Sequence, residues 1–323
     1  MKKLALLAIL LAFVGGISFA NGNAEEATND KAVAKWPKNV EIIVPAGAGG
    51  DTDFNARLLA QKLTDKLGVN FVVSNVNGNG GATGTRQVKN AKNDGSTMLF
   101  YHSAVVVNQL TGASDYGFEA FDFACIAAQS RGNCITINSK LGVNNLPDLI
   151  SYSKQHPGKL KIAVQTGATS HASALLLKSV GLDATIVDAG SAAGRLTALL
   201  GNHVDIILAA YGTIKDYIDA GELVAVGLDG LYDLDEVGVK SVESYGFNIG
   251  FPFYYSCSFP KGTPSVLVQQ LSDSVKDIVE NDEDYQARIF KAYYQKPVYF
   301  NSVDGLAEYQ KVHDLLKDVS FGI

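Results

Sequence analysis

Two glycine-rich segments are the part of this sequence best suited to bind a ligand through the main chain. The first, residues 44–53, reads Val-Pro-Ala-Gly-Ala-Gly-Gly-Asp-Thr-Asp, and the second, residues 75–84, reads Asn-Val-Asn-Gly-Asn-Gly-Gly-Ala-Thr-Gly. Glycine permits positive φ and a close approach of the backbone to a ligand. A helix that starts directly after such a turn points free N–H groups and its positive dipole end at the same place. The pair therefore predicts one anion-binding pocket, although either segment alone fits equally well a tight turn that binds nothing.

Both segments lie between a predicted strand and a predicted helix. Runs rich in β-branched and aromatic residues precede them at 40–44 and 71–73. After the first segment, apolar residues recur at helical spacing until Gly68, a typical C-terminal cap. Strand and helix signals then alternate, which predicts an α/β fold with parallel strands. Near the C-terminus, Pro264 and Ser302 open two more helices, and the second is expected to carry on one face Leu306, Tyr309, Val312, Leu315 and Leu316.

Two apolar extended stretches, residues 123–127 and 253–257, bracket the central third of the chain. We interpret them as two strands that cross between lobes. This predicts a first lobe of residues 36–127 and 252–323, which carries both glycine-rich segments, and an inserted second lobe of residues 128–251. Hinged proteins of this kind hold their ligand in the cleft between the lobes.

The start of the chain is typical of an exported protein. Residues 1–20 combine Lys2 and Lys3, an apolar stretch and small residues at a cleavage spacing, which predicts a signal peptide. The apolar stretch is too short to span a bilayer, and residues 21–35 are expected to be a flexible lead-in. Removing residues 1–20 would change the formal net charge from −6 to −8. An acidic chain without a basic run is a poor partner for nucleic acid. We therefore expect a soluble, periplasmic protein.

Few residues suggest catalysis, a cofactor or a metal. The glycine spacings fail the dinucleotide fingerprint, and the sequence contains no phosphate-binding Gly-Lys-Ser/Thr loop and no Gly-x-Ser-x-Gly elbow. The five histidines have no metal-ligand spacing. Cys125, Cys134 and Cys257 match no zinc pattern; buried thiols are favoured over one disulfide with a leftover cysteine. The sequence predicts no catalytic residue, no metal and no cofactor.

In this context the two segments resemble the solute-binding proteins of tripartite tricarboxylate transporters, also called the Bug family. The family's first loop, Val-Pro-Phe-x-x-Gly-Gly-x-x-Asp, and its second, Asn-x-Pro-Gly-x-Gly-Gly-x-x-Gly, are each matched at most positions. Later matches include Thr166-Gly167 with Ser170-His171 and Gly262-Thr263-Pro264. The resemblance extends in order over residues 36–316. The matching loop residues are Val44, Pro45, Gly49, Gly50, Asp53, Asn75, Gly78, Gly80, Gly81 and Gly84.

The resemblance implies a two-lobed periplasmic-binding-protein fold of type II, with two crossing hinge strands. A small carboxylate would lie in the cleft, and the loaded protein, a monomer, would deliver it to one large and one small integral membrane subunit. Two other functions stay open at this point: a ligand receptor for a membrane sensor kinase, and an exported enzyme that acts on a carboxylic acid.

The expected ligand-binding residues come from the glycine-rich loops, from the second lobe that would close over them, and from hydroxyl groups at strand ends, where an α/β cleft gathers contacts. Each hydroxyl taken singly is as well explained by a helix cap. The full set is Ala46, Gly47, Ala48, Gly49, Gly50, Thr52, Asp53, Gly78, Asn79, Gly80, Gly81, Ser103, Thr166, Gly167, Ser170, Gly190, Ser191, Arg195 and Tyr211.

Several residues depart from the family pattern in ways that bear on the ligand. Ala46 replaces a phenylalanine and Asn77 a proline. Asp51 stands where the family has a small or hydroxyl residue, so it either faces solvent or accepts an ammonium group of an amino-acid ligand. Arg195 either binds a second ligand carboxylate through two hydrogen bonds or forms a surface salt bridge. Tyr211 replaces part of an acidic-amide pair and could line the cleft.

Overall fold

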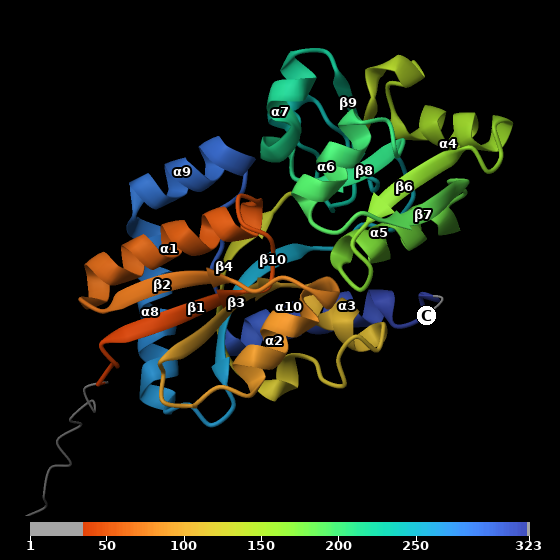
Figure 1. The fold of residues 1–323 in the computed structure, drawn as a ribbon. Coiled ribbons are helices and arrows are strands. Elements are labelled where there is room, and N and C mark those ends of the chain that lie inside the picture. The colour runs from red at the N-terminus through yellow and green to blue at the C-terminus, as the bar shows by residue number, and fades with distance from the viewer. Residues whose placement is uncertain (1–34, 322–323) are drawn as a thin grey trace, which may run out of the picture. The chain divides into compact units, whose positions relative to one another are not determined.

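The structure is a computed structural model that describes residues 35–321, and these residues form two lobes, each built around one β-sheet (Figure 1). The mixed α/β fold with two sheets confirms the predicted fold class. The predicted signal peptide, residues 1–20, and nearly all of the predicted lead-in lie outside the described residues. None of the helices within 35–321 is long and apolar enough to cross a bilayer.

The sheet of the first lobe has six strands in the order β11-β4-β10-β3-β1-β2. Strands β1, β2 and β3 are parallel, whereas β10 runs antiparallel to β3 and β4. The strands are β1 (Asn39–Val44), β2 (Asn70–Asn75), β3 (Thr97–His102), β4 (Phe121–Ser130), β10 (Phe253–Pro260) and β11 (Phe300–Asn301). Six helices pack with this sheet: α1 (Asp51–Leu67), α2 (Ala82–Lys89), α3 (Ala104–Leu110), α8 (Ser265–Asn281), α9 (Glu283–Tyr293) and α10 (Ser302–Leu316).

The sheet of the second lobe has five strands in the order β7-β6-β8-β5-β9. Strand β6 is parallel to β7 and β8, but β5 is antiparallel to both β8 and β9, so the sheet is mixed and not wholly parallel as the alternation predicted. The strands are β5 (Cys134–Asn138), β6 (Leu160–Val164), β7 (Ala184–Asp188), β8 (Ile206–Ala209) and β9 (Leu223–Leu228). Its helices are α4 (Leu146–Gln155), α5 (Thr169–Ser179), α6 (Ala192–Leu200) and α7 (Tyr211–Asp219).

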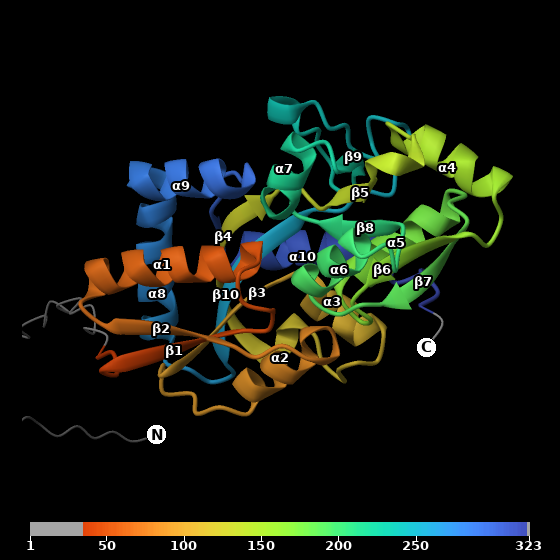
Figure 2. The same cartoon turned by 45° about the horizontal axis from the view of Figure 1, so that its top comes forward.

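The two predicted apolar stretches are the neighbouring strands β4 and β10, which pair in the middle of the first sheet and lead toward the second lobe (Figure 2). Their side chains are almost entirely buried. Cys125 on β4 stands directly opposite Cys257 on β10, and both are buried and free, as is Cys134. Burial raises the pKa of the Cys125 thiol.

Local sequence signals explain the boundaries of helix α1. Gly50 is the residue before its first turn, and Gly68 ends it with a φ of 66° and an N–H bond to the Thr64 carbonyl. Its buried face carries Leu58, Leu59 and Leu63, as the helical spacing predicts.

The final helix, α10, differs from the expectation. It buries Tyr309, Val312 and Leu316, but Leu306 and Leu315 are 41% and 38% exposed, so the apolar stripe is narrower than the sequence suggested.

Candidate ligand cavity between the two lobes

A cavity of about 260 Å³ lies where the first glycine-rich loop meets the second lobe. It is below the roughly 300–1,000 Å³ typical of pockets for drug-sized ligands, so it suits a small molecule. The first lobe contributes the loop of residues 45–52 and the end of β3, and the second lobe contributes the first turns of α5, α6 and α7. The lining residues are Pro45, Ala46, Gly47, Ala48, Gly49, Gly50, Asp51, Thr52, Tyr101, His102, Asn133, Gln165, Ala168, Thr169, Ser170, Ser191, Ala192, Ala193, Arg195, Ala210, Thr213 and Phe253.

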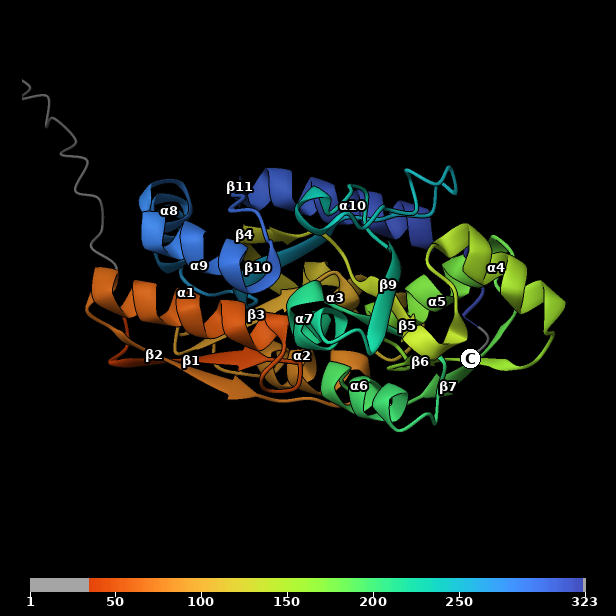
Figure 3. The same ribbon diagram turned by 90° about the horizontal axis from the view of Figure 1, so that it is seen from above.

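Four helices begin at this cavity. Figure 3 shows the first turn of α1 beside α6 and α7. Helix α5 of the second lobe also begins at the cavity wall. Gly50, Ala168 and Ala210 precede α1, α5 and α7 without a side-chain cap, whereas Ser191 caps α6. Uncapped first-turn N–H groups and the positive ends of the helix dipoles attract an anion. The cavity is therefore arranged to bind negative charge.

Arg195 adds a full positive charge to this arrangement. It lies on α6 and is only 7% exposed. Its guanidinium donates to the Leu208 carbonyl at 3.2 and 2.9 Å and to the Gly190 carbonyl at 2.7 Å. Because a guanidinium has five N–H groups, two remain without a partner among residues 35–321. Burial lowers the pKa of Arg195 to about 10, with nearby carboxylates opposing the shift, so the group stays charged at neutral pH.

Asp51, the first residue of α1, brings a carboxyl group to the opposite wall. Its side chain accepts a hydrogen bond from the hydroxyl of Tyr255, a fully buried residue of β10. The Tyr255 hydroxyl in turn accepts from Gln295 Nε2 at 3.0 Å, and Asn55 Nδ2 donates to Gln295 Oε1 at 2.7 Å. Burial raises the pKa of Asp51, and the Tyr255 hydrogen bond partly offsets this rise. The network fixes the orientation of the carboxyl group at the cavity wall.

His102 is a lining residue that the sequence reasoning missed. It stands at the end of β3, directly before Ser103, which was selected. Burial lowers its pKa to about 3, so the ring is neutral at physiological pH. Its Nδ1 accepts a hydrogen bond from the Ala104 N–H at 3.2 Å, which leaves the proton on Nε2 as a donor. The same strand-end rule that selected Ser103 could have found it.

The second glycine-rich loop does not line the cavity; it meets the second lobe beside it. A Cβ atom on Gly80 would lie 2.5 Å from the carbonyl carbon of Gly167. Asn108 Nδ2 donates to the Gly80 carbonyl at 3.0 Å and to the Gly167 carbonyl at 2.7 Å. Gln165 Nε2 also donates to Asn77 Oδ1 at 3.0 Å. This loop therefore allows the lobes to approach closely, and in the described arrangement the two lobes are in contact.

The structure brings about half of the predicted site residues to the cavity wall. These come from the first loop and from the starts of α1, α5 and α6, namely Ala46, Gly47, Ala48, Gly49, Gly50, Thr52, Ser170, Ser191 and Arg195. Ser170 Oγ accepts from the Gln165 N–H at 3.0 Å, so its own proton is available to a ligand.

The remaining predicted residues lie close by but do not line the cavity. Asp53 braces the first loop by accepting from the Gly49 N–H at 2.9 Å and from Arg57. Ser103 donates to the Pro252 carbonyl, and Tyr211 packs on Tyr294 with ring centroids 5.5 Å apart. The others contribute backbone at the lobe contact or beside it: Gly78, Asn79, Gly80, Gly81, Thr166, Gly167 and Gly190.

Two lobes in contact, with a small anion-attracting cavity between them, are the architecture of a ligand-binding protein of the periplasmic type. The chain belongs to the family described as the tripartite tricarboxylate transporter family receptor, TctC, whose model matches residues 55–304. It is 28% identical over 258 residues, 75% of this chain and 71% of the relative, to a protein encoded in the TAR-I ttuE-ttuC' intergenic region of Agrobacterium vitis. It is 25% identical to protein BugT of Bordetella pertussis, with 84% and 85% of the two chains covered.

Solved structures confirm the fold. A Rhodopseudomonas palustris protein with adipate superimposes with a TM-score of 0.80 at 24% identity, covering 88% of this chain and 98% of that chain. MatC of the same species, with bound malate, has a TM-score of 0.78 at 21% identity, covering 88% and 99%. The periplasmic binding protein BugD has a TM-score of 0.76 at 24% identity, covering 88% and 98%. The chain is thus a solute-binding protein and not an enzyme.

Proposed function

We propose that this protein captures a small organic acid in the interlobe cavity and delivers it to a tripartite tricarboxylate-type membrane transporter. The observation that carries the proposal is the convergence of four helix N-termini and the buried Arg195 on one small cavity. A carboxylate that leaves water must replace its hydration with several donors. Backbone N–H groups, the Ser170 hydroxyl and the two free N–H groups of Arg195 supply them.

The proposed mechanism is closure of two lobes about the ligand. Residues 36–127 with 252–323 would move against residues 128–251, hinged at the strands that pass between them. The ligand contacts both lobes, so it favours the closed form by its differential affinity for that form. The relatives with adipate and with malate support a carboxylate as the ligand class, and the family supports an extracytoplasmic location and membrane partners.

The first test identifies what the protein carries. The purified protein is denatured, the released small molecules are identified by mass spectrometry, and the refolded protein is titrated calorimetrically with a panel of organic and amino acids. We expect a small carboxylate to bind. Absence of binding across the panel would contradict the proposal.

A substitution then locates the site. Arg195→Gln removes the buried charge and should weaken carboxylate binding by roughly 100-fold, since hydrogen bonds to charged groups contribute about 1.5–3 kcal/mol each. Arg288→Gln, the same change on the exposed face of α9, serves as the matched control and should leave affinity unchanged. Equal affinities in both variants would remove Arg195 from the site. Uptake of the identified acid by cells that lack the protein tests delivery.

A further inference from the structure

We infer that the ligand is an amino acid, with its carboxylate bound by Arg195 and its ammonium group bound by Asp51. This inference rests on the proposed function and narrows the class of organic acid that the cavity takes. It is carried by the charges of the cavity wall, their positions on opposite lobes, and the absence of any ion pair between them.

The cavity wall holds one acidic and one basic side chain. Of the lining residues, Asp51 carries the only carboxyl group and Arg195 the only guanidinium, and His102 is kept neutral by burial. Asp51 belongs to the first lobe and Arg195 to the second. A molecule with an ammonium group at one end and a carboxylate at the other matches this distribution.

Asp51 and Arg195 form no salt bridge, although the two lobes are in contact. Gly47 lies so near Ser191 that an added Cβ would be 3.3 Å from the Ser191 Cβ, yet no salt bridge within 4.0 Å joins Asp51 to Arg195 in the described part of the chain. Both residues line the same cavity, and neither side chain has an ion-pair partner within 4.0 Å among residues 35–321. A small zwitterion in this cavity would pair both groups.

Asp51 is held in place by a dedicated set of hydrogen bonds. Tyr255, Gln295 and Asn55 form a chain that ends on its carboxyl group, and Tyr255 and Gln295 are fully buried. A solvated surface aspartate needs no such support. The network fixes the Asp51 carboxyl oxygens as hydrogen-bond acceptors for a ligand at the start of α1. The backbone there offers only N–H donors.

The other acidic groups near Arg195 already have partners and do not line the cavity. Asp188 accepts from the Thr166 and Gly190 N–H groups, and Asp229 accepts from Asn133 and from the Ser173 hydroxyl. They leave Asp51 as the carboxyl group that a bound molecule would meet.

A dicarboxylate fits this wall less well. Its second carboxylate would approach Asp51 and be repelled, unless Asp51 took up a proton and donated it as a hydrogen bond. Replacing Asp51 with asparagine separates these cases. The amide has nearly the same shape, keeps an oxygen for the Tyr255 hydroxyl and supplies a neutral donor, so it should discriminate against ammonium but not against carboxylate.

The test uses matched pairs that differ in one amino group: L-alanine and propionate, L-aspartate and succinate, L-glutamate and glutarate, L-leucine and 4-methylpentanoate. Calorimetry on the ligand-stripped full chain should show at least one amino acid binding at least tenfold tighter than its des-amino partner. Asp51→Asn should weaken binding of that amino acid at least tenfold. The same variant should bind the des-amino acid as tightly as the native protein does, or more tightly. Asp65→Asn, on an exposed position of the same helix, should change neither.

The outcomes separate this inference from the proposed function. If des-amino acids bind as tightly as their amino partners and Asp51→Asn weakens both equally or neither, the inference is overturned while carboxylate binding stands. If no member of any pair binds and no wider carboxylate does, the proposed function falls and the inference falls with it. Melting temperatures of both variants within a few degrees of the native protein would show that folding does not account for the difference.

Discussion

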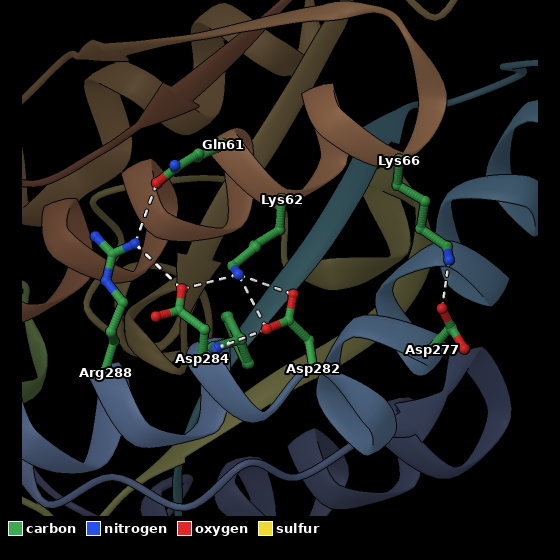
Figure 4. Close-up of polar contacts among 8 residues, drawn as sticks. Gln61, Lys62, Lys66, Asp277, Asp282, Asp284 and Arg288 are labelled. Carbon is green, nitrogen blue, oxygen red and sulfur yellow. Dashed lines mark hydrogen bonds and ion pairs between the residues drawn. The ribbon is translucent and has the colours of Figure 1, made fainter.

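Helix α1 carries charged side chains along its length, and Asp51 at its start differs from the others: Asp53 pairs with Arg57 at 3.0 Å, and the lysines near the other end are paired too. At the C-terminal end, Lys62 pairs with Asp282 at 2.9 Å and with Asp284 at 2.8 Å, and Lys66 pairs with Asp277 (Figure 4). At the N-terminal end, Asp51 lies at the cavity without a cation, opposite an Arg195 that has no carboxylate within 4.0 Å among residues 35–321.

The difference shows which charges belong to folding and which to binding. Arg288 extends the surface cluster by contacting Asp284 at 3.6 Å and Gln61 at 3.1 Å, so each basic group there has a partner within the protein. The outer pairs, Lys66 with Asp277 and Arg288 with Asp284, are exposed and contribute little to stability, whereas Lys62 is mostly buried and has two carboxylate partners. A buried charge without an opposite charge is costly. The protein tolerates this at the cavity, where a ligand would supply the missing partners.

Gly80→Ala is expected to have the largest effect of the changes below, because it would prevent the closure that keeps the cavity charges away from water. The new Cβ would lie 2.5 Å from the Gly167 carbonyl carbon and 2.8 Å from the Thr166 oxygen. We expect carboxylate affinity to fall at least tenfold in calorimetry, and the radius of gyration with saturating ligand to stay at its ligand-free value in small-angle scattering.

Gly68→Ala is the matched control for this substitution. Gly68 has nearly the same φ as Gly80, 66° against 64°, but nothing lies within 4 Å of its added Cβ. Both variants bear the cost of a left-handed alanine, about 1–2 kcal/mol, while only Gly80→Ala meets the other lobe. Similar affinities in the two variants would show that the Gly80 contact is irrelevant to closure.

Tyr255→Phe should have an intermediate effect, because it disturbs the support of Asp51 and leaves the carboxyl group in place. Without the hydroxyl, the pKa of Asp51 should rise further and the buried Gln295 Nε2 loses its acceptor. We expect affinity for an amino acid to drop several-fold and stability to fall by about 1–2 kcal/mol, measured by calorimetry and urea unfolding.

Tyr285→Phe provides the comparison for that result. Tyr285 is also fully buried, and its hydroxyl donates to the Ala127 carbonyl at 3.2 Å, within the core of the first lobe. It should lose a similar amount of stability without any change in affinity. If Tyr285→Phe weakened binding as much as Tyr255→Phe, general loosening of the lobe would explain both.

Local patterns were enough to predict the parts of the site that are built locally. Gly50 and the apolar spacing after it place the start of α1, and Ser191 followed by Arg195 places a charged side chain one turn into α6. A glycine-rich turn before a helix has the same physical consequence wherever the chain goes next. For this reason most of the first-loop residues expected at the ligand lie at the cavity wall, although Asp53 braces the loop and Asp51 was left open.

The parts that depend on distant packing could not be predicted in the same way. Tyr255 bonds Asp51 across 204 positions of sequence, and nothing in either segment indicates the partner. The second loop is glycine-rich like the first, yet its Gly80 makes room for contact with Gly167 and does not line the cavity. Tyr211 begins α7, as a cleft-lining residue could, but its ring packs on Tyr294, which directly follows α9.

Lys62→Met addresses the paired end of α1 and should have the smallest effect. We expect the melting temperature to fall by no more than about 2 °C, because surface ion pairs contribute little, and ligand affinity to stay unchanged. The substitution keeps a long apolar side chain over the α1–α9 contact, so packing is conserved. A large loss of affinity would contradict the separation of the two ends.

The pKa values of Asp282 and Asp284 predict how the effect of Lys62→Met on the melting temperature changes with pH. For Asp282, burial alone would raise the pKa, but hydrogen bonds from Lys62 and from the Tyr285 N–H lower it, and Lys62 also lowers the pKa of Asp284. A carboxyl group with a lowered folded-state pKa stabilises the fold above its ordinary value of 3.8 and loses this contribution as the pH falls through the lowered value. Lys62, whose pKa is raised above 10.5, stays charged throughout this range. The gap in melting temperature between native protein and Lys62→Met should therefore be constant from pH 5 to pH 8 and close as the pH falls below about 3.8, whereas a gap that persisted in acid would mean that packing, and not charge, holds this end of the helix.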